Sequence, residues 1–330
     1  MKAAFISRPG GPEVLEVREV PAPEPRANEV LVRVMAAGVN RADLLQRQGK
    51  YPAPADAPQE IPGLEFAGEV AKLGQNAGCW KIGQRVFGIC GGGAQAEFLA
   101  AHELMLTEVP ANLSWSEAAG ITEVFITAHD ALFTQAGLRA GERLLVHAAG
   151  SGVGLAAIQL ARAWGAEVYG TSRTAEKLQR AREFGLQAEV VVNDPAELPE
   201  KVKALTGGHG VDVVLDLVGG SYVVPSVAAL APKGRLLLVG TVAGGKAELA
   251  LGQVMSKRLK IMGTTLRGRS LEEKIAATQA FAREVVPLLA SGKIRATIDR
   301  EFPLAEIAAA HKRVEMNDTF GKVIIKIGVI

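Results

Sequence analysis

Short apolar segments alternate with amphipathic segments through the middle of the chain. The apolar segments are rich in Val and Leu and run without polar interruption, as expected for strands buried on both faces of a sheet. They begin at Arg143 and recur at 167–171, 190–193, 211–216, 234–240 and 260–263. Helical segments are expected between them at 175–184, 199–205, 222–230 and 249–255. This alternation predicts an α/β fold, in which a doubly wound parallel sheet carries helices on both faces.

A glycine-rich turn follows the first of these strands. The run His147-Ala-Ala-Gly-Ser-Gly-Val-Gly154 leads directly into an apolar helix. In that context the N–H groups and dipole of the helix start attract a pyrophosphate, and small residues let it approach closely. The alternative is a loop that only packs the helix. Two registers of the dinucleotide fingerprint are open: one ends on Gly154, with Ala149 and Ser151 at its first two glycine positions, and the other uses Gly152, Gly154 and Ala157.

Residues 1 to about 110 follow a different pattern. Strands are predicted at 3–6, 14–20, 29–37, 65–72 and 97–101, separated by turns rich in Pro and Gly. This punctuation predicts a compact, antiparallel, barrel-like β domain. Within it, residues 40–51 form one or two helical turns before a proline-rich loop.

Two further segments flank the predicted parallel sheet. Residues 112–136 lead into it, with Asn112 or Ser114 as a helix cap and a helix at 127–135. After the sheet, the pattern predicts a long amphipathic helix at 270–291, a strand at 297–302, a helix at 304–316 and a strand at 321–327. This tail is expected to return to the N-terminal domain, because sharing its sheet leaves fewer exposed edges.

Composition narrows the class of protein. The 330 residues favour two domains, and a hydrophobic content of 48% suffices for a core. A net charge of +2 with scattered basic residues gives no indication of a nucleic-acid partner. No apolar run is long enough to span a membrane, and the first residues do not form a signal peptide, so a cytoplasmic location is expected. Cys79 and Cys90 form neither a disulfide framework nor a zinc spacing.

Three motifs carry a resemblance to a known family. Ala37-Gly-Val-Asn-Arg-Ala-Asp43, Pro62-Gly-Leu-Glu-Phe-Ala-Gly-Glu-Val70 and the glycine turn resemble the quinone oxidoreductase (zeta-crystallin) family of the medium-chain dehydrogenase/reductase superfamily. The run Asn40-Arg-Ala-Asp-Leu-Leu-Gln-Arg-Gln-Gly-Lys-Tyr51 is most similar to its stress-inducible branch. The resemblance implies a GroES-like catalytic domain at 1–122, a Rossmann dinucleotide-binding domain at 123–266 and a segment at 267–330 that returns to the catalytic domain. It also implies a homodimer.

Departures from the zinc alcohol dehydrogenases of the same superfamily predict a protein without catalytic zinc. Those enzymes place a cysteine near position 38–40 and a His-Glu pair in a Gly-His-Glu segment. Here the corresponding positions hold Val39-Asn40 and Leu64-Glu65. A catalytic zinc needs three converging ligands of Cys, His or carboxylate type. No metal site is therefore expected.

The end of the second parallel strand bears on the choice of cofactor. An NAD-binding fold usually places an Asp or Glu there, on the ribose hydroxyls. This chain instead offers Ser172, Arg173 and Lys177, whose hydroxyl and charges suit the 2′-phosphate of NADPH. The alternative is that Arg173 and Lys177 are only a solvated helix start. Asn193 stands where relatives often carry a tyrosine of the adenosine site.

The remaining cofactor residues follow from the resemblance and from the expected position of the crevice at the carboxyl ends of the strands. The pyrophosphate turn comprises Ala149, Ser151, Gly152, Val153 and Gly154. The nicotinamide half is expected near Gly240, Thr241, Thr264 and Leu266, with Asn317 and Lys322 as further candidates near the final turn.

Three residues match family positions that line the acceptor site. Hydride transfer to a quinone or enone builds negative charge on oxygen, which hydrogen-bond donors stabilise. Asn40, Tyr51 and Thr127 each offer a donor. The alternatives are a turn or helix cap for Asn40, a packing role for Tyr51 and a helix cap for Thr127. His147 is expected to be a buried strand residue and Asp43 a helix N-terminal charge rather than a base.

The expected activity is zinc-independent, NADPH-dependent reduction of quinones or related α,β-unsaturated carbonyls. An enoyl-thioester or alkenal reductase on the same fold is the first alternative. An NADPH-binding regulatory protein with little catalysis is the second, because fold does not fix function.

Overall fold

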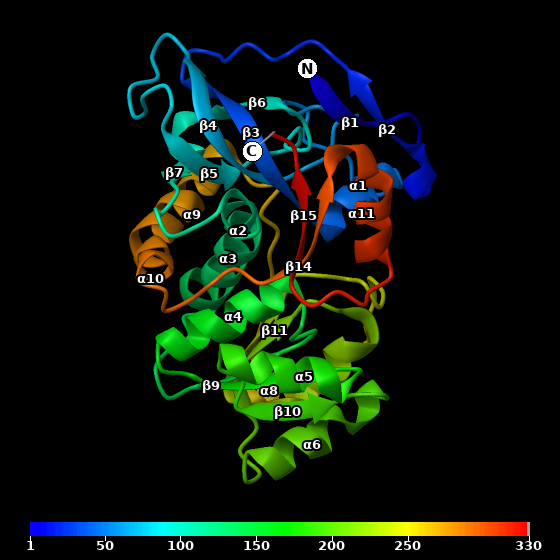
Figure 1. Cartoon of the computed structure of the whole chain (residues 1–330). Coiled ribbons are helices and arrows are strands. Elements are labelled where there is room, and N and C mark those ends of the chain that lie inside the picture. The colour runs from blue at the N-terminus through cyan, green and yellow to red at the C-terminus, as the bar shows by residue number, and fades with distance from the viewer. Residues whose placement is uncertain (329–330) are drawn as a thin grey trace. The chain divides into compact units, whose positions relative to one another are not determined.

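The computed structural model describes residues 1–328 and divides the chain into two compact units. The first unit combines Met1–Ile126 with the chain from Leu266 onward, and the second comprises Thr127–Thr265, green to yellow in Figure 1. Two distant stretches of sequence therefore build the first unit, whereas the second is continuous. The functional domain limits expected at 122/123 and 266/267 stay predictions.

The second unit is built on a six-stranded parallel sheet with strand order β10-β9-β8-β11-β12-β13. The strands are β8 (Arg143–Val146), β9 (Glu167–Ser172), β10 (Ala188–Val191), β11 (Val211–Asp216), β12 (Leu230–Leu238) and β13 (Lys260–Gly263). The chain runs outward from β8 to β10 and then returns to β11 on the other side of β8. This reversal creates the switch point at which doubly wound sheets bind ligands. The predicted doubly wound fold is confirmed.

Helices connect these strands. They are α4 (Gly152–Ala163), α5 (Ala175–Ala181), α6 (Leu198–Leu205), α7 (Val223–Ala229) and α8 (Leu251–Lys257), with short turns η4 (Arg182–Phe184), η5 (Pro195–Glu197) and η6 (Gly220–Tyr222). The strand expected from residue 234 begins earlier, at Leu230 of β12. An irregularity in its pairing with β11 accompanies the positive φ of 66° at Lys233. β12 contains Pro232 and Gly234, residues that are typical of loops, and the predicted strand therefore began only at residue 234.

The first unit holds a seven-stranded sheet with the order β14-β15-β3-β4-β5-β7, in which β6 also pairs with β3. Its strands are β3 (Glu29–Val39), β4 (Glu65–Leu73), β5 (Arg85–Ile89), β6 (Phe98–His102), β7 (Leu106–Glu108), β14 (Ile298–Pro303) and β15 (Lys322–Lys326). A separate hairpin pairs β1 (Lys2–Ile6) with β2 (Leu15–Glu19). Because β15 lies antiparallel to β3, the C-terminal tail completes the N-terminal sheet.

The sequence pattern missed β5 and β7. Val86 to Ile89 of β5 are all buried, so this strand lacks the alternation of a half-exposed strand, and β7 is very short. The helices of the unit are α1 (Arg41–Arg47), α2 (Trp115–Ala119), α9 (Leu271–Glu284), α10 (Val286–Ala290) and α11 (Ile307–Glu315), with 3₁₀ turns η1 (Pro12–Val14), η2 (Glu103–Met105) and η7 (Leu304–Glu306).

Two helices differ from the sequence-based expectation. The long helix expected at 270–291 is split into α9 and α10 at Val285, because Pro287 lacks the N–H that a continuous helix would need. The helix expected to start at residue 127 starts earlier, as α3 (Thr122–His129), and continues into the π-helical turn η3 (Asp130–Gln135). No helix within residues 1–328 combines the length and apolarity needed to cross a bilayer.

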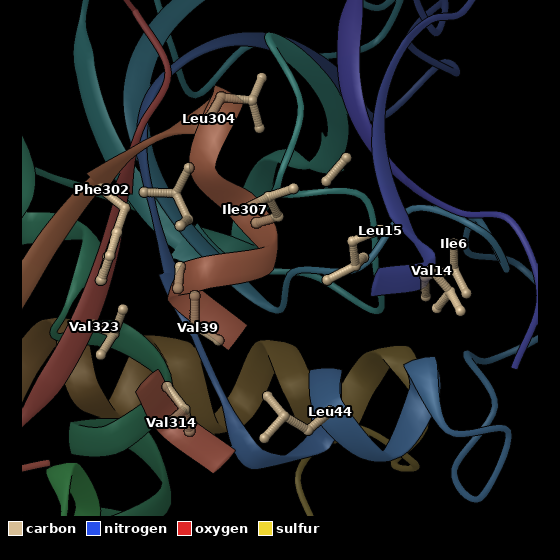
Figure 2. Close-up of a cluster of buried hydrophobic side chains, with 13 residues drawn as sticks. Ile6, Val14, Leu15, Val39, Leu44, Phe302, Leu304, Ile307, Val314 and Val323 are labelled. Carbon is tan, nitrogen blue, oxygen red and sulfur yellow. The ribbon is translucent and has the colours of Figure 1, made fainter. Parts of the chain in front are cut away.

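A hydrophobic cluster joins the two stretches of the first unit (Figure 2). Val39 at the end of β3 and Val323 of β15 are register partners, and both are buried in this cluster. Leu44 of α1 and Val314 of α11 pack against it. This core therefore brings the residue after β3, Asn40, next to the first residue of β15, Lys322.

Candidate functional site

The glycine turn between β8 and α4 presents free backbone donors. Ser151 caps α4, and its Oγ accepts a hydrogen bond from the N–H of Gly154 at 3.1 Å. The N–H groups of Gly152 and Val153 have no acceptor among residues 1–328, as expected for the first residues of a helix. A Cβ at Gly154 would lie 2.5 Å from the carbonyl oxygen of Ala148, so the helix approaches the turn too closely for a side chain. This close approach is the role of the last fingerprint glycine, and the turn fits a pyrophosphate.

The other predicted cofactor residues of the second unit also follow strands. Each lies at or just past the carboxyl end of a strand in one parallel sheet, and therefore at the same edge as the glycine turn: Ser172 for β9, Asn193 for β10, Gly240 and Thr241 for β12, and Thr264 for β13. The Oγ1 of Thr264 accepts a hydrogen bond from Gln135 at 2.7 Å. Asn193 and Thr241 are exposed.

The basic residues expected near the ribose lie on the β9–α5 connection. Ser172 ends β9, and its Oγ accepts the N–H of Thr174 at 3.2 Å. Arg173 is exposed, and Lys177 is half-buried in the first turn of α5. Burial raises the pKa of the Tyr222 phenol, and the charge of Arg173 acts against that rise. The connection thus places a hydroxyl and two cations next to the glycine-turn edge.

Asp216 is a residue of this edge that the sequence analysis did not single out. It ends β11, and its Oδ1 accepts the N–H groups of Val218 and Gly219, both at 2.8 Å. Its Oδ2 is buried and has no hydrogen-bond partner among residues 1–328. The carboxylate therefore fixes the turn after β11. An Asp before a Gly-Gly pair at a strand end was the available indication in the sequence.

His147 is buried, as predicted, although it lies just past β8. Its Nδ1 lies 2.9 Å from Thr171 Oγ1, and its Nε2 lies 2.7 Å from Ser226 Oγ. Ser226 donates its own proton to the Tyr222 carbonyl, so it accepts from His147, whose proton is on Nε2. Burial lowers the pKa of His147 to about 4, and the ring is neutral at pH 7. It ties the turn to neighbouring elements and is not a base.

In the first unit, a buried ion pair surrounds Asn40. The Lys322 ammonium donates to the Val39 carbonyl at 2.8 Å and to Asn40 Oδ1 at 2.6 Å, and it pairs with Glu65 Oε1 at 2.7 Å. Asn40 Nδ2 donates to the same Glu65 oxygen at 3.0 Å. All three ammonium donors are used within this network, and the expectation that Lys322 reaches the cofactor stays a prediction. In the structure the lysine holds Asn40.

The network fixes the orientation of the Asn40 amide. An ammonium only donates and a carboxylate only accepts, so the oxygen must face Lys322 and the nitrogen must face Glu65. Asn40 occupies the cap position of α1, as the alternative interpretation of the sequence expected, and the carboxylate of Asp43 accepts the Asn40 N–H at 2.8 Å. The second amide N–H of Asn40 has no acceptor within residues 1–328.

Two further carboxyl groups lie close to this network. Asp43 is fully buried on α1 and accepts the N–H of Gly63 at 2.9 Å, and burial raises its pKa to about 6. It is the helix N-terminal charge that the sequence predicted. The N–H of Glu123 donates to Glu65 Oε2 at 2.8 Å. Burial and the nearby charge of Glu65 raise the pKa of the Glu123 carboxyl to about 8.

Tyr51 lies in the loop after α1 and is half-buried. The Arg267 guanidinium lies 5.4 Å from the centroid of its ring, within the range of a cation–π contact. The Tyr51 hydroxyl has no hydrogen-bond partner among residues 1–328, so it is a free donor.

Three predicted residues remain, one in the second unit and two in the first. Thr127 is the sixth residue of α3, so the alternative role as a helix cap is wrong; it is the first residue of the second unit. Leu266 is buried in the first unit. Asn317 is exposed with a positive φ of 56°, and its side-chain oxygen accepts a hydrogen bond from Arg41.

The metal-ligand positions of the zinc dehydrogenases are otherwise engaged. Of Val39, Asn40, Leu64 and Glu65, only Glu65 is a zinc-ligand type, and both its oxygens have partners. Within residues 1–328, no three His, Cys, Asp or Glu side chains gather in a way that would hold a metal ion.

Comparisons with known proteins agree with this architecture. Residues 26–111 match the alcohol dehydrogenase GroES-like domain, and residues 152–283 match the family described as zinc-binding dehydrogenase. A quinone oxidoreductase of Pseudomonas aeruginosa is 35% identical over 96% of both chains. The Escherichia coli quinone oxidoreductase, solved with NADPH, is 30% identical with a TM-score of 0.88, over 99% of this chain and 100% of that one. The CurK enoyl reductase structure has 28% identity and a TM-score of 0.87, covering 99% of each chain.

The predicted GroES-like and Rossmann domains and the predicted family are thereby confirmed. The glycine turn, the parallel-sheet edge and relatives that match nearly the whole chain all indicate a nicotinamide-dependent enzyme. The chain belongs to the quinone oxidoreductase family of the medium-chain dehydrogenase/reductase superfamily, and the protein is an oxidoreductase.

Proposed function

We propose that the protein reduces quinones or related α,β-unsaturated carbonyls with NADPH, by hydride transfer and without zinc. The observation that carries this proposal is the pair of polar groups in the first unit, Asn40 and Tyr51, each with an N–H or O–H that has no acceptor among residues 1–328. Quinone oxidoreductase relatives support the acceptor class.

The two donors suit the charge that the reaction creates. The reduced nicotinamide supplies the hydride when it is bound. Negative charge then develops on the acceptor oxygen, where fixed donors stabilise it and a proton from solvent completes the reduction. The Asn40 amide is preoriented by Lys322 and Glu65, so it does not need to reorganise during the reaction. Thr127 is a third candidate donor. The Tyr51 phenol acts as a hydrogen-bond donor and not as a base.

Zinc independence rests on the charge of Lys322. Its ammonium lies against Asn40 and Glu65, where a zinc ion would need anionic or imidazole ligands. Lys322 would repel a second cation at this position. Among Val39, Asn40, Leu64 and Glu65, only Glu65 could serve as a zinc ligand.

The choice of NADPH over NADH rests on Ser172, Arg173 and Lys177. The chain has no acid at the tip of β9, and two cations follow it. Arginine matches a phosphate with forked donors, and lysine adds charge.

Two other functions give distinguishable results. Similarity to the CurK enoyl reductase favours an enoyl-thioester reductase as the second candidate. Turnover of simple ortho- and para-quinones in parallel with crotonyl-thioesters separates the two activities. Tight NADPH binding without turnover of either class would instead indicate a regulatory binding protein.

We also propose that the protein is a homodimer and that it acts in the cytoplasm. β13 is an outer strand of the parallel sheet, with unpaired backbone groups on one side. The helix before it, α8, exposes Leu251 and Met255, at 70% and 76% of their surfaces. Pairing of two copies along β13 would satisfy the strand edge and cover apolar surface.

Removing the Tyr51 hydroxyl is expected to slow quinone reduction. Tyr51→Phe keeps the ring over Arg267 and should lower turnover by about tenfold to a hundredfold, somewhat less than the loss of a preorganised oxyanion donor. NADPH affinity should remain nearly unchanged. Tyr169→Phe, which removes a hydroxyl near Glu167 on β9, is the matched control. Turnover is measured by steady-state kinetics. If Tyr51→Phe reduces quinones at the rate of the unmutated protein, the donor role passes to Asn40 and Thr127.

Removing the Arg173 charge is expected to reduce the preference for NADPH. The unmutated protein should bind NADPH more tightly than NADH, and Arg173→Ala should narrow the difference by about 1.5–3 kcal/mol, the range for a hydrogen bond to a charged group. Arg180→Ala, in the last turn of α5, is the control and should leave the difference intact. Equal affinities of the unmutated protein for the two cofactors, measured by fluorescence titration, would mean that these cations are solvated surface.

Chelators are expected to leave activity intact. Because Lys322 occupies the position between Asn40 and Glu65, the purified protein should contain no stoichiometric zinc by elemental analysis. Quinone turnover should be the same before and after dialysis against a strong chelator. One zinc per chain, with activity lost on its removal and restored on its return, would contradict the zinc-free mechanism.

The proposed dimer is expected in sedimentation experiments. At micromolar concentration the protein should sediment at twice the 34.7 kDa chain mass. Met255→Glu on α8 should weaken association, because it places a charge in the apolar surface beside β13. A species of one chain mass alone in the unmutated protein would disprove the dimer.

A further inference from the structure

Arg267 is a buried cation without a salt-bridge partner among residues 1–328. Only 5% of its surface is exposed. Its Nε donates to the Gly91 carbonyl at 2.8 Å, its Nη2 to Gln46 Oε1 at 2.6 Å and its Nη1 to the Tyr51 carbonyl at 3.3 Å. The carboxyl groups of Asp43 and Glu123 lie close enough for the charge of Arg267 to offset part of the rise that burial causes in the pKa of each. Burying a guanidinium without an opposite charge costs free energy of folding, and packing alone does not explain its place here.

Arg267 contacts the loop of residues 49–61, which we call the acceptor loop, directly at Tyr51 and indirectly through Gln46. This loop contains Tyr51 and has no helix or strand to hold it. Gln46 of α1 accepts from Arg267 with its oxygen and donates with its nitrogen to the Gln59 carbonyl at 2.7 Å. Gln59 in turn donates to the Pro54 carbonyl at 2.9 Å and the Ala57 carbonyl at 3.0 Å. These side-chain donors add to the backbone hydrogen bonds of the loop, in which the Leu45 carbonyl accepts the Tyr51 N–H and the Glu60 carbonyl accepts the Ile6 N–H.

Arg267 fixes both parts of Tyr51. One N–H group holds the tyrosine carbonyl, and the guanidinium lies beside the ring at 5.4 Å from its centroid. The planar fork of arginine can serve three diverging acceptors and an aromatic face at once, and the compact ammonium of lysine cannot. The hydroxyl is left as the free end of the side chain.

We infer that Arg267 is the positioning residue of the acceptor site: it fixes the acceptor loop and orients the Tyr51 hydroxyl toward the oxygen of the acceptor. This inference rests on the proposed function for its catalytic consequence. It concerns the quinone or enone and not the nicotinamide cofactor, because the hydrogen bonds and the ring contact that Arg267 makes with residues 1–328 lie within the first unit.

The experiment is a double-mutant cycle of Arg267→Lys and Tyr51→Phe. Arg267→Lys retains the charge but loses the fork. It should lower kcat/KM for quinones by about tenfold to a hundredfold, as expected when a donor is displaced by about an ångström, and leave the Kd for NADPH within about twofold. Because the arginine acts through Tyr51, Arg267→Lys should cost much less in the Tyr51→Phe background. If the two substitutions lower kcat/KM by factors that multiply in the double variant, Arg267 acts independently of Tyr51 and the inference is wrong. An unchanged kcat/KM in Arg267→Lys alone would also overturn the positioning role.

A structural readout keeps the inference separate from the activity. Backbone hydrogen exchange of the acceptor loop should be faster in Arg267→Lys, whereas peptides from β3 and β15 should remain protected. Gln46→Met, which removes one acceptor of the guanidinium, is the milder second variant and should act in the same direction. Arg235→Lys is the matched control, since Arg235 donates to the Ala136 and Gly137 carbonyls and pairs with Glu142 in the second unit.

The two proposals fail in different ways. If the unmutated holoenzyme reduces no quinone or enone, the proposed function fails, and loop exchange still decides whether Arg267 holds the loop. If the unmutated enzyme is active but loop exchange is identical in Arg267→Lys, the positioning inference fails alone.

Discussion

The buried ion pair between Lys322 and Glu65 is the interaction on which the first unit and its site depend. Lys322 begins β15 and Glu65 begins β4, and both strands lie beside β3. Neither charge can be solvated, so each requires the other, and truncating one would leave a buried charge without compensation. The pair therefore ties the C-terminal strand to the N-terminal sheet. It does so at the point where Asn40 leaves β3.

The same pair carries a chemical consequence. A cation on one side and a carboxylate on the other leave a single orientation for the Asn40 amide. In the zinc dehydrogenases of the superfamily a metal ion provides the positive charge near the substrate oxygen. Here the positive charge of Lys322 is used to hold Asn40, and under the proposed function neutral donors contact the acceptor. An active site of this kind depends on precise orientation, since a neutral hydrogen bond weakens steeply when it is misaligned.

The two units hold their predicted site residues in place in different ways. In the second unit the residues of the predicted cofactor site are fixed by the backbone, because parallel strands end at one edge and Gly154 lets α4 approach the turn. In the first unit the acceptor loop has no helix or strand, and side chains of Arg267, Gln46 and Gln59 help to hold it. A backbone site suits a cofactor whose phosphates are always the same.

The sequence by itself determined the features that depend on local pattern. Buried Val- and Leu-rich strands alternating with helices specified the doubly wound sheet, and the glycine turn indicated the dinucleotide site. The identities of Val39, Asn40, Leu64 and Glu65 indicated a site without the usual zinc ligands. The break between α9 and α10 was not predicted, because periodicity suggested one helix at 270–291 and Pro287 was not considered. Strands β5 and β7 were not predicted, because a short buried strand has no alternating pattern that would distinguish it.

Only the tertiary structure decided which distant residues meet. Lys322 was a candidate for the cofactor, but the pairing of Val323 with Val39 places it against Asn40 and Glu65. Gln46 lies within the family-like run at 40–51, but the sequence assigned no role to it or to Arg267, and the structure shows both holding the loop that contains Tyr51. Asp216 and Glu123 acquire their roles from burial and from neighbours remote in the chain. Pattern reports how a segment relates to solvent and to its own neighbours, whereas the pairing of buried charges depends on strand order and register, which the local sequence does not encode.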